Sequence, residues 1–428
     1  MARCDNCVTP PTLDSYRIDS TERLHALDSL RAGMMLLGIV LHVLSLYIDF
    51  PLRRIPDAGT SAAFDFAFLL LHIFRMPVFF MMSGFFAALL LRRRGARRFI
   101  ANRTGRIVVP FVVGWLPLFV LVWMSAAFAV RRSYGKFAIE DQGFRLALFV
   151  RDQGLVHLWF LYYLIIYYAL AIAAWAVWRR LPAGPVTVAK MYFARLAPST
   201  VGCALLCLFT FPALFRMRLG VPATSLSFIP TPAVLYLYGF FFFFGAALYV
   251  QCDLLPVLRR GAWTRVLLGL ALFPLNFFAT RFQGNLLLPD IRARALAAAT
   301  GSISAWLLTL GLLGLFLEYA NTPNRYIRYL TDAAYWLYLV HLPLVNYIGG
   351  ILARTVLPLW LKALLTLVIA IPLLLLSYHL MVRSTFIGKT LNGRKYSRSL
   401  PEVEVEALPA PALEEQADLA SPAVSALP

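Results

Sequence analysis

Two ionisable side chains, Arg31 and His42, stand eleven residues apart within an apolar run near the start of the chain. Eleven residues are almost three turns of an α-helix, so both side chains share one helix face, roughly 16 Å apart along the axis. Asp28 precedes Arg31 by one turn and can pair with it. Imidazole titrates near neutral pH and suits proton abstraction from a hydroxyl group. Because an ionisable residue inside a membrane-length apolar run is costly, His42 is the first candidate for a functional residue.

The second apolar run repeats this pattern. His72 and Arg75 are one turn apart, and Ser83 follows His72 by eleven residues, nearly on the same face. A proline between them predicts a bend, and the glycine after Ser83 allows another backbone or a ligand to come close. In a functional interpretation the buried Arg75 binds an anion. In a structural interpretation it pairs with Asp49 or Asp65 in a kinked packing helix.

Arg103 and Arg106 precede the third apolar run. Two arginines at this spacing project together from a helix end and suit bidentate contacts with phosphate groups, such as those of coenzyme A. His157 and His341 each stand beside aromatic residues. A single histidine of this kind is more often a packed, hydrogen-bonded side chain, and we keep both as candidates for substrate contact.

The elements that must position these residues are transmembrane helices. Of the 428 residues, 60% are apolar and 14% are charged, whereas soluble proteins average about 25% charged residues. We therefore predict an all-α, polytopic integral membrane protein. Runs long enough to cross a hydrocarbon core of roughly 30 Å recur about ten times. The predicted spans are 31–49, 66–91, 107–130, 158–178, 198–215, 233–250, 262–280, 301–319, 334–353 and 357–380.

The net charge of +19 is explained mainly by topology. With both termini in the cytoplasm, about 25 Lys and Arg fall on the cytoplasmic side and about 14 outside, as the positive-inside rule requires. The basic residues are scattered over short loops, so nucleic acid is not an expected partner. We divide the chain into a cytoplasmic segment (1–30), a transmembrane domain (31–382) and a second cytoplasmic segment (383–428). The last is Pro/Ala/Glu-rich and expected to be disordered from about residue 399.

The cysteines indicate no metal site. Cys4 and Cys7 form a lone CxxC pair, and zinc sites of this type need a second ligand pair, which does not follow at a suitable spacing. The other three cysteines lie in apolar surroundings and are most simply packing residues. No cysteine or serine is clearly paired with His42. If His42 serves acyl transfer to a hydroxyl group, this favours direct transfer of the acyl group between two bound substrates over a covalent acyl-enzyme.

Taken together, these motifs resemble the membrane-bound acyltransferase-3 family. They occur in the family's order over the first quarter of the chain, with one departure, because Ala32 precedes Gly33 where a glycine commonly follows the arginine. The matching residues are Arg23, Leu27-Asp28, Leu30-Arg31, His42, Phe-x-x-Ser-Gly-Phe around Ser83, and Arg103-x-x-Arg106 before Pro110.

Further motifs narrow the resemblance to members that succinylate periplasmic glucans, and extend it to roughly residues 20–395. These motifs are His72-Ile73-Phe74-Arg75-Met76-Pro77, His157-Leu158-Trp159-Phe160-Leu161, Tyr335-Trp336-Leu337-Tyr338-Leu339-Val340-His341 and Gly388-Lys389-Thr390-Leu391-Asn392-Gly393.

The resemblance implies an enzyme of the bacterial inner membrane that takes an acyl group from cytoplasmic acyl-CoA. The acyl group passes to a glucan hydroxyl reached from the opposite side. In this scheme His42 is the general base, and Asp28 and Arg31 orient the first helix or contact the donor. Arg103 and Arg106 hold the coenzyme A phosphates.

The resemblance also implies a substrate-binding role for Arg75, which would stabilise the oxyanion or the free carboxylate of a succinyl donor. His72, Ser83, His157 and His341 would complete the substrate site. Acyl-CoA is then a co-substrate and no cofactor is permanently bound. The expected partners are acyl-CoA, the glucan, the lipid bilayer and, by the same resemblance, the glucan-synthesis machinery.

Two alternatives remain. One is O-acetylation of lipopolysaccharide or another exported polysaccharide. The other is a transporter that exports a glucan or lipid-linked sugar along the same polar residues. Transporters often contain inverted repeats, and we find no internal repeat in this sequence.

Overall fold

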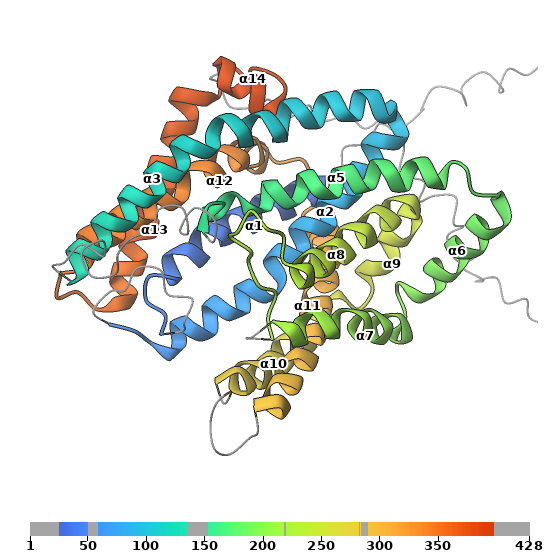
Figure 1. Cartoon of the computed structure of the whole chain (residues 1–428), viewed down its shortest axis with the longest axis horizontal. Helices are drawn as coiled ribbons and strands as arrows, with labels where there is room; N and C mark the ends of the chain where they lie inside the picture. The colour runs from blue at the N-terminus through green and yellow to red at the C-terminus, as the bar shows by residue number, and fades with distance from the viewer. Residues whose placement is uncertain are drawn as a thin grey trace, which may run out of the picture.

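The computed structural model describes residues 25–49, 59–134, 153–217, 220–281, 283 and 290–397. The regular elements of this part of the chain are all helices, and residues 220–231 form a longer non-helical connection between two of them. Figure 1 shows the arrangement. The helices are α1 (His25–Leu44), α2 (Ala62–Arg103), α3 (Val109–Tyr134), α5 (Trp159–Trp178), α6 (Ala183–Leu196), α7 (Thr200–Arg216), α8 (Pro232–Val250), α9 (Leu255–Arg259), α10 (Ala262–Arg281), α11 (Asp290–Tyr319), α12 (Arg325–Leu352), α13 (Leu359–Ser377) and α14 (Phe386–Asn392). Short tighter or wider turns are η2 (Thr104–Val108), η3 (Val156–Leu158), η4 (Cys252–Leu254) and η5 (Tyr378–Val382).

The all-α, polytopic prediction is confirmed, but the helices divide differently from the ten predicted spans. Eight helices of the described chain are long and apolar enough to cross a membrane, or nine if the bent pair α6 and α7 forms one span. The longest, Ala62–Ser133, joins α2 to α3, which the sequence predicted as two spans. Gly95 interrupts it with a φ of 70°, a left-handed conformation that glycine adopts without steric cost. Figure 1 shows the chain turning there, so that α3 runs back past α2.

Helix α1 carries His42 and lies inside the bundle. It packs against α2, α11, α12 and α13, and Leu30, Ile39 and Val43 on it are completely buried. Because α1 packs against α2 near the start of the chain and against α11, α12 and α13 near its end, it brings early and late sequence motifs together. Residues that are far apart in the sequence can therefore meet in one site beside α1.

The glycine after Ser83 serves helix packing. A Cβ atom at Gly84 would lie 1.8 Å from the carbonyl oxygen of Phe242, and one at Gly245 would lie 1.8 Å from that of Met81. Helices α2 and α8 thus touch backbone to backbone, as small residues allow in membrane bundles. The sequence left open whether a backbone or a ligand approaches the Ser-Gly pair, and the structure places α8 there.

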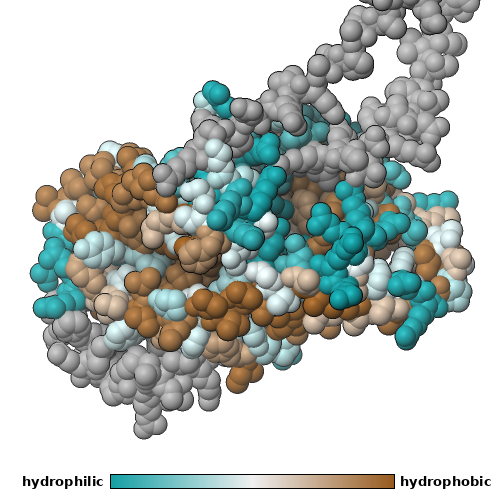
Figure 2. Space-filling view, turned by 90° about the horizontal axis from the view of Figure 1, so that it is seen from above, coloured by the Kyte–Doolittle hydropathy of each residue, from teal (hydrophilic) through white to brown (hydrophobic). Residues whose placement is uncertain are grey.

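Large apolar side chains cover the outside of the bundle. Val113 on α3, Leu208 on α7 and Val368 on α13 are each at least 59% exposed. Figure 2 shows broad apolar areas on one face, with hydrophilic side chains gathered in separate patches. In water such a surface would be unfavourable, so it fits a multi-pass protein whose helices face lipid.

Candidate active site

Three predicted site residues from distant parts of the chain meet in the bundle. The ring centroid of His341 on α12 lies 4.9 Å from that of His42 on α1 and 5.5 Å from that of His157 at η3. His157 and His341 are buried, and His42 is half-buried. We call these three residues the histidine cluster.

Backbone carbonyls of α12 fix the proton position on two of the rings. His341 Nδ1 lies 3.0 Å from Leu337 O and 2.8 Å from Tyr338 O, and His157 Nε2 lies 2.9 Å from Leu339 O. A carbonyl oxygen only accepts, so these nitrogens carry the hydrogen. In a neutral ring the lone pair of His341 is then on Nε2, which is buried and has no hydrogen-bond partner within the described chain. This nitrogen can accept a proton.

His157 is held by an unusual backbone conformation. Val156 precedes it with a φ of 43°, which is strained for a β-branched residue. Two hydrogen bonds retain the turn: Leu155 N donates to Leu226 O at 2.8 Å, and Tyr338 OH donates to His157 O at 2.7 Å. Strain of this kind persists where the surrounding structure imposes it, and here it sets the position of the His157 ring.

Arg75 lies close to the histidine cluster. Its Nη1 atom is 2.7 Å from where a Cβ atom of Gly38 would be, and Gly38 is one helical turn before His42 on α1. Tyr238, Tyr338 and His341 lie within electrostatic range of the Arg75 guanidinium group. The side chain is 9% exposed and its Nε atom has no hydrogen-bond partner in the described structure.

The predicted pairing of Arg75 with Asp49 or Asp65 is wrong. Asp65 forms an ion pair of 3.0 Å with Arg281, and Asp49 lies 4.0 Å from the same guanidinium. Among the described residues, no carboxylate lies within ion-pair distance of Arg75. A buried cation without a counter-ion is costly, so Arg75 is suited to receive an anionic ligand.

The other two predicted residues of α2 occupy separate positions. His72 lies one turn before Arg75, is buried, and stacks on Phe68 with centroids 5.4 Å apart. Ser83 is half-buried beside the close contact of α2 with α8. Within the described part of the chain, no hydrogen bond joins Ser83 to the histidine cluster.

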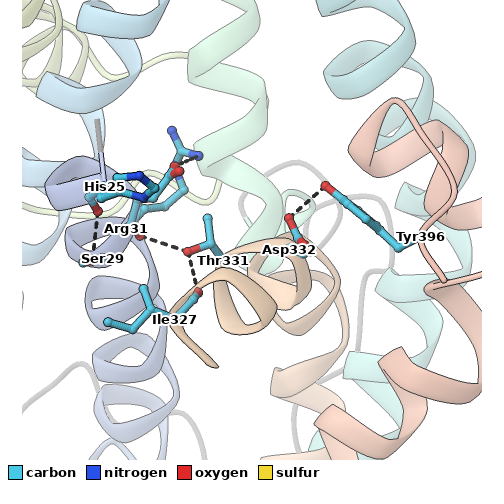
Figure 3. Close-up of polar contacts among 8 residues, drawn as sticks. His25, Ser29, Arg31, Ile327, Thr331, Asp332 and Tyr396 are labelled. Atoms are coloured by element: carbon cyan, nitrogen blue, oxygen red, sulfur yellow. Dashed lines mark hydrogen bonds and ion pairs between the residues drawn. The ribbon is translucent and has the colours of Figure 1, made fainter. Parts of the chain in front are cut away.

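Asp28 and Arg31 lie at the other end of α1. Their side chains pair at 3.5 Å, and the Arg31 guanidinium lies 4.6 Å from the ring centroid of Phe86. Thr331 Oγ1 on α12 donates to Asp28 O at 3.1 Å, a contact drawn in Figure 3. This pair therefore joins α1 to its neighbours and is about 16 Å from His42 along the helix.

Arg103 and Arg106 flank the transition from α2 to α3. The Arg103 guanidinium lies 4.9 Å from the ring centroid of Tyr168, while Arg106 Nε donates to Leu391 O at 3.1 Å. They contact different neighbours, yet the charges of both Arg103 and Arg31 act on Arg106. We call Arg31, Arg103 and Arg106 the arginine cluster, and its concentrated positive charge would attract a multiply charged anion.

Comparison with known proteins identifies the family. A protein-family model described as an acyltransferase domain matches residues 24–380 of this chain. This range contains the histidine cluster, Arg75 and the arginine cluster. This chain belongs to the acyltransferase-3 family. It is accordingly a multi-pass membrane acyltransferase.

Curated relatives of this acyltransferase include glucans biosynthesis protein C of Escherichia coli O6:K15:H31, strain 536, which is 24% identical over 392 residues. The protein of the same name from Shigella dysenteriae serotype 1, strain Sd197, is 24% identical over 395 residues. Both alignments cover 87% of this chain and 95% of the relative. No solved structure matches the chain.

Sequence reasoning missed a contact between the C-terminal segment and the acyltransferase bundle. Tyr396 OH donates to Asp332 Oδ1 at 2.8 Å, and Asn392 Nδ2 donates to Asp332 O at 3.1 Å. Burial raises the pKa of the Tyr396 phenol, so this donor stays protonated at neutral pH. Figure 3 shows Tyr396 reaching Asp332 on α12. The motif at residues 388–393 was visible in the sequence, but nothing in it identified α12 as its partner.

Arg23, the CxxC pair and the tail beyond residue 397 lie outside the described residues.

Proposed function

We propose that this acyltransferase transfers a succinyl group from succinyl-CoA to hydroxyl groups of periplasmic glucan. The observation that carries the proposal is Arg75, a buried guanidinium without a carboxylate partner in the described structure, one turn of α1 away from His42. Succinyl-CoA has a free carboxylate beyond its thioester, and a buried guanidinium binds a carboxylate through charge-assisted hydrogen bonds. An acetyl donor has no group to satisfy Arg75.

The reaction follows from the histidine cluster. The hydroxyl oxygen of the acceptor attacks the thioester carbonyl, His42 takes the hydroxyl proton, and the new C–O bond forms as the C–S bond breaks. The proton then reaches the leaving thiolate, giving free coenzyme A. The His341 ring lies 4.9 Å from the His42 ring, centroid to centroid, and its Nε2 lone pair has no hydrogen-bond partner in the described chain, so we assign it as the second proton acceptor of the site. Transfer is direct, within a complex of both substrates.

The arginine cluster supports the donor side of the proposal. Coenzyme A carries a diphosphate and a ribose phosphate, and guanidinium groups bind such oxygens in bidentate geometry. Asp28 orients Arg31 through their ion pair, and Arg103 and Arg106 supply the other cations. Because α1 separates this cluster from the histidine cluster by roughly 16 Å, the extended donor could place its phosphates at one and its thioester at the other.

The names of the relatives support glucan as the acceptor, and the distribution of charge supports the orientation in the membrane. The name of the curated relatives, glucans biosynthesis protein C, favours a glucan acceptor. The arginine cluster then faces the cytoplasm, in agreement with the positive-inside rule. We accordingly place the protein in the bacterial inner membrane with both termini cytoplasmic.

Radiolabelled succinyl-CoA and acetyl-CoA test the proposal in membranes that contain periplasmic glucan. Wild type should label glucan with succinate, and His42→Ala should abolish labelling. Arg75→Leu should lower succinyl transfer roughly 10–100-fold, the loss of one charge-assisted contact, and affect acetyl transfer less, while Arg75→Lys should retain part of the preference. Equal losses with both donors would remove the carboxylate role of Arg75. If neither donor labels glucan at normal protein levels, the glucan assignment falls.

A further inference from the structure

A second site lies away from the histidine and arginine clusters, where the bent pair α6 and α7 meets α10 and α11. A cavity of about 720 Å³ opens there, within the usual range of 300–1,000 Å³ for small-molecule sites. Its walls combine small, apolar and a few polar residues, among them Ser199, Cys203, Cys207, Arg265 and Ser302. None of the residues assigned to acyl transfer lines this cavity.

One end of the cavity is built to receive negative charge. Ser199 precedes α7 and lines the cavity, so the start of this 17-residue helix lies at the cavity wall, where Ser199 Oγ accepts from Gly202 N at 2.9 Å. Arg265, in the first turns of α10, also lines the cavity and interacts electrostatically with Cys203 in the first turn of α7. Its Nη1 atom donates to Leu258 O at 2.8 Å, which uses one of the five guanidinium N–H donors. A helix N-terminus and a guanidinium together favour a phosphate group.

The remainder of the cavity is apolar and opens sideways. Leu208 and Leu268 form part of the lining and are 65% and 50% exposed on the outer surface of the bundle. A ligand that enters between them comes from the hydrocarbon region rather than from water. Deeper in the wall, Ser302 is 1% exposed, and its Oγ atom has no hydrogen-bond partner in the described structure. A buried hydroxyl left in this state is costly, so it points to a ligand with a polar atom at this depth.

We propose that this cavity binds one anionic membrane lipid. The lipid phosphate contacts Arg265 and the start of α7, an acyl chain lies against Leu208 and Phe211, and Ser302 donates to an ester oxygen between them. The cavity suits a ligand with both a phosphate group and an acyl chain, because its charged end is small and its apolar part is open to the bilayer. A free phosphate ion would leave the apolar walls and Ser302 unsatisfied. The site is independent of the proposed acyl-transfer reaction.

The cysteines of the native chain provide the test. Cys203 and Cys207 line the cavity, whereas Cys252 is half-buried elsewhere. The full-length protein, delipidated in detergent, is treated with N-ethylmaleimide and modification of each cysteine is followed by peptide mass spectrometry. Phosphatidylglycerol should slow the modification of Cys203 and Cys207 several-fold and leave Cys252 unchanged. Phosphatidylcholine should protect less, and inorganic phosphate should not protect.

Two variants test the charged end. Arg265→Gln should weaken protection by phosphatidylglycerol at least fivefold, to the level seen with phosphatidylcholine. Arg179→Gln is the matched control, because Arg179 is an exposed cation over Trp175 that does not line the cavity. Equal protection by the two lipids, or protection by phosphate alone, would overturn an anionic lipid as the ligand. Absence of protection, or equal protection of Cys252, would overturn the site itself.

Discussion

The substitution Gly38→Ala tests whether the position of Arg75 controls acyl transfer. Gly38 lies within α1, and the added methyl group would be 2.7 Å from Arg75 Nη1, whereas ordinary contacts begin at 3.4 Å. The α1 backbone is fixed by its neighbours, so the guanidinium, at the end of a flexible side chain, must retreat by about 0.7 Å or more. The substitution therefore displaces Arg75 without removing its charge.

The substitution should lower the rate of succinyl transfer and leave the stability almost unchanged. A misplacement of about 1 Å in a positioned group can lower a rate by roughly 10²-fold, so succinyl transfer should fall about 10–100-fold. Replacing glycine by alanine inside a helix gains up to about 1 kcal/mol of helix propensity, which should offset the small cost of moving a flexible side chain. The variant should thus be as stable as wild type and much slower.

Steady-state transfer from labelled succinyl-CoA, together with thermal unfolding of the purified protein in detergent, measures both effects. Gly33→Ala on the same helix is the matched control, because its methyl group would meet the Phe316 ring at an ordinary 3.4 Å. It should retain wild-type transfer. If Gly38→Ala transfers succinate within twofold of Gly33→Ala, the position of Arg75 does not limit the reaction and our assignment fails.

Two further predictions concern stability. Tyr396→Phe removes the hydrogen bond to Asp332 and should cost about 1–2 kcal/mol at pH 7, whereas the exposed Tyr192→Phe should be neutral in the same unfolding assay. Because burial raises the pKa of Tyr396 above the phenol value of 10.0, its stabilisation is fully present below pH 10 and is lost as the pH rises through the raised pKa; a difference between wild type and variant that already shrinks below pH 9 would contradict this. Gly245→Ala places a methyl group 1.8 Å from a backbone carbonyl oxygen of α2, so the helices must separate and stability should fall by roughly 1–3 kcal/mol or more. Gly114→Ala, whose nearest neighbour would be an ordinary 3.5 Å away, should not lower it.

The sequence predicted the helices well because a membrane span needs a continuous apolar run, which is a local property. The ten predicted ranges all overlap described helices. The sequence did not predict how neighbouring helices are connected. Arginines on both sides of Gly95 separate the two predicted apolar runs, but they do not show that α2 continues beyond the left-handed glycine as far as Arg103. The 103° bend between α6 and α7 likewise depends on packing.

The site was predicted in its parts but not in its assembly. Helical periodicity places His42 relative to Arg31, because both lie on one helix. It carries no information on His341, 299 residues further along, whose ring meets His42 through packing of α1 on α12. The same limit left the partner of Arg75 open, since the competing aspartates pair with Arg281 on α10. Nothing in the sequence indicated Gly38, because its role is to leave space for the Arg75 side chain of α2, and this contact forms only when α2 packs against α1.

The proximity of His42 and His341 raises the question of whether the two rings act as one unit. His341→Asn can preserve the hydrogen bond to the α12 carbonyls, because the amide nitrogen of asparagine corresponds to Nδ1, while it removes the lone pair at Nε2. General-base catalysis contributes typically 10²–10⁴-fold, and we expect His42→Ala and His341→Asn each to lose activity in this range. His379→Asn, outside the histidine cluster, should not.

The double variant decides between two arrangements. If the proton is shared between the rings, the second substitution removes little more, because groups that act as a unit are strongly non-additive. The double variant should then be about as slow as the slower single variant, measured as kcat with both substrates saturating. If the losses multiply, the two histidines act on different steps, and His341 binds substrate rather than accepting the proton. A rate for His341→Asn within threefold of wild type would exclude both arrangements and leave His42 as the sole base.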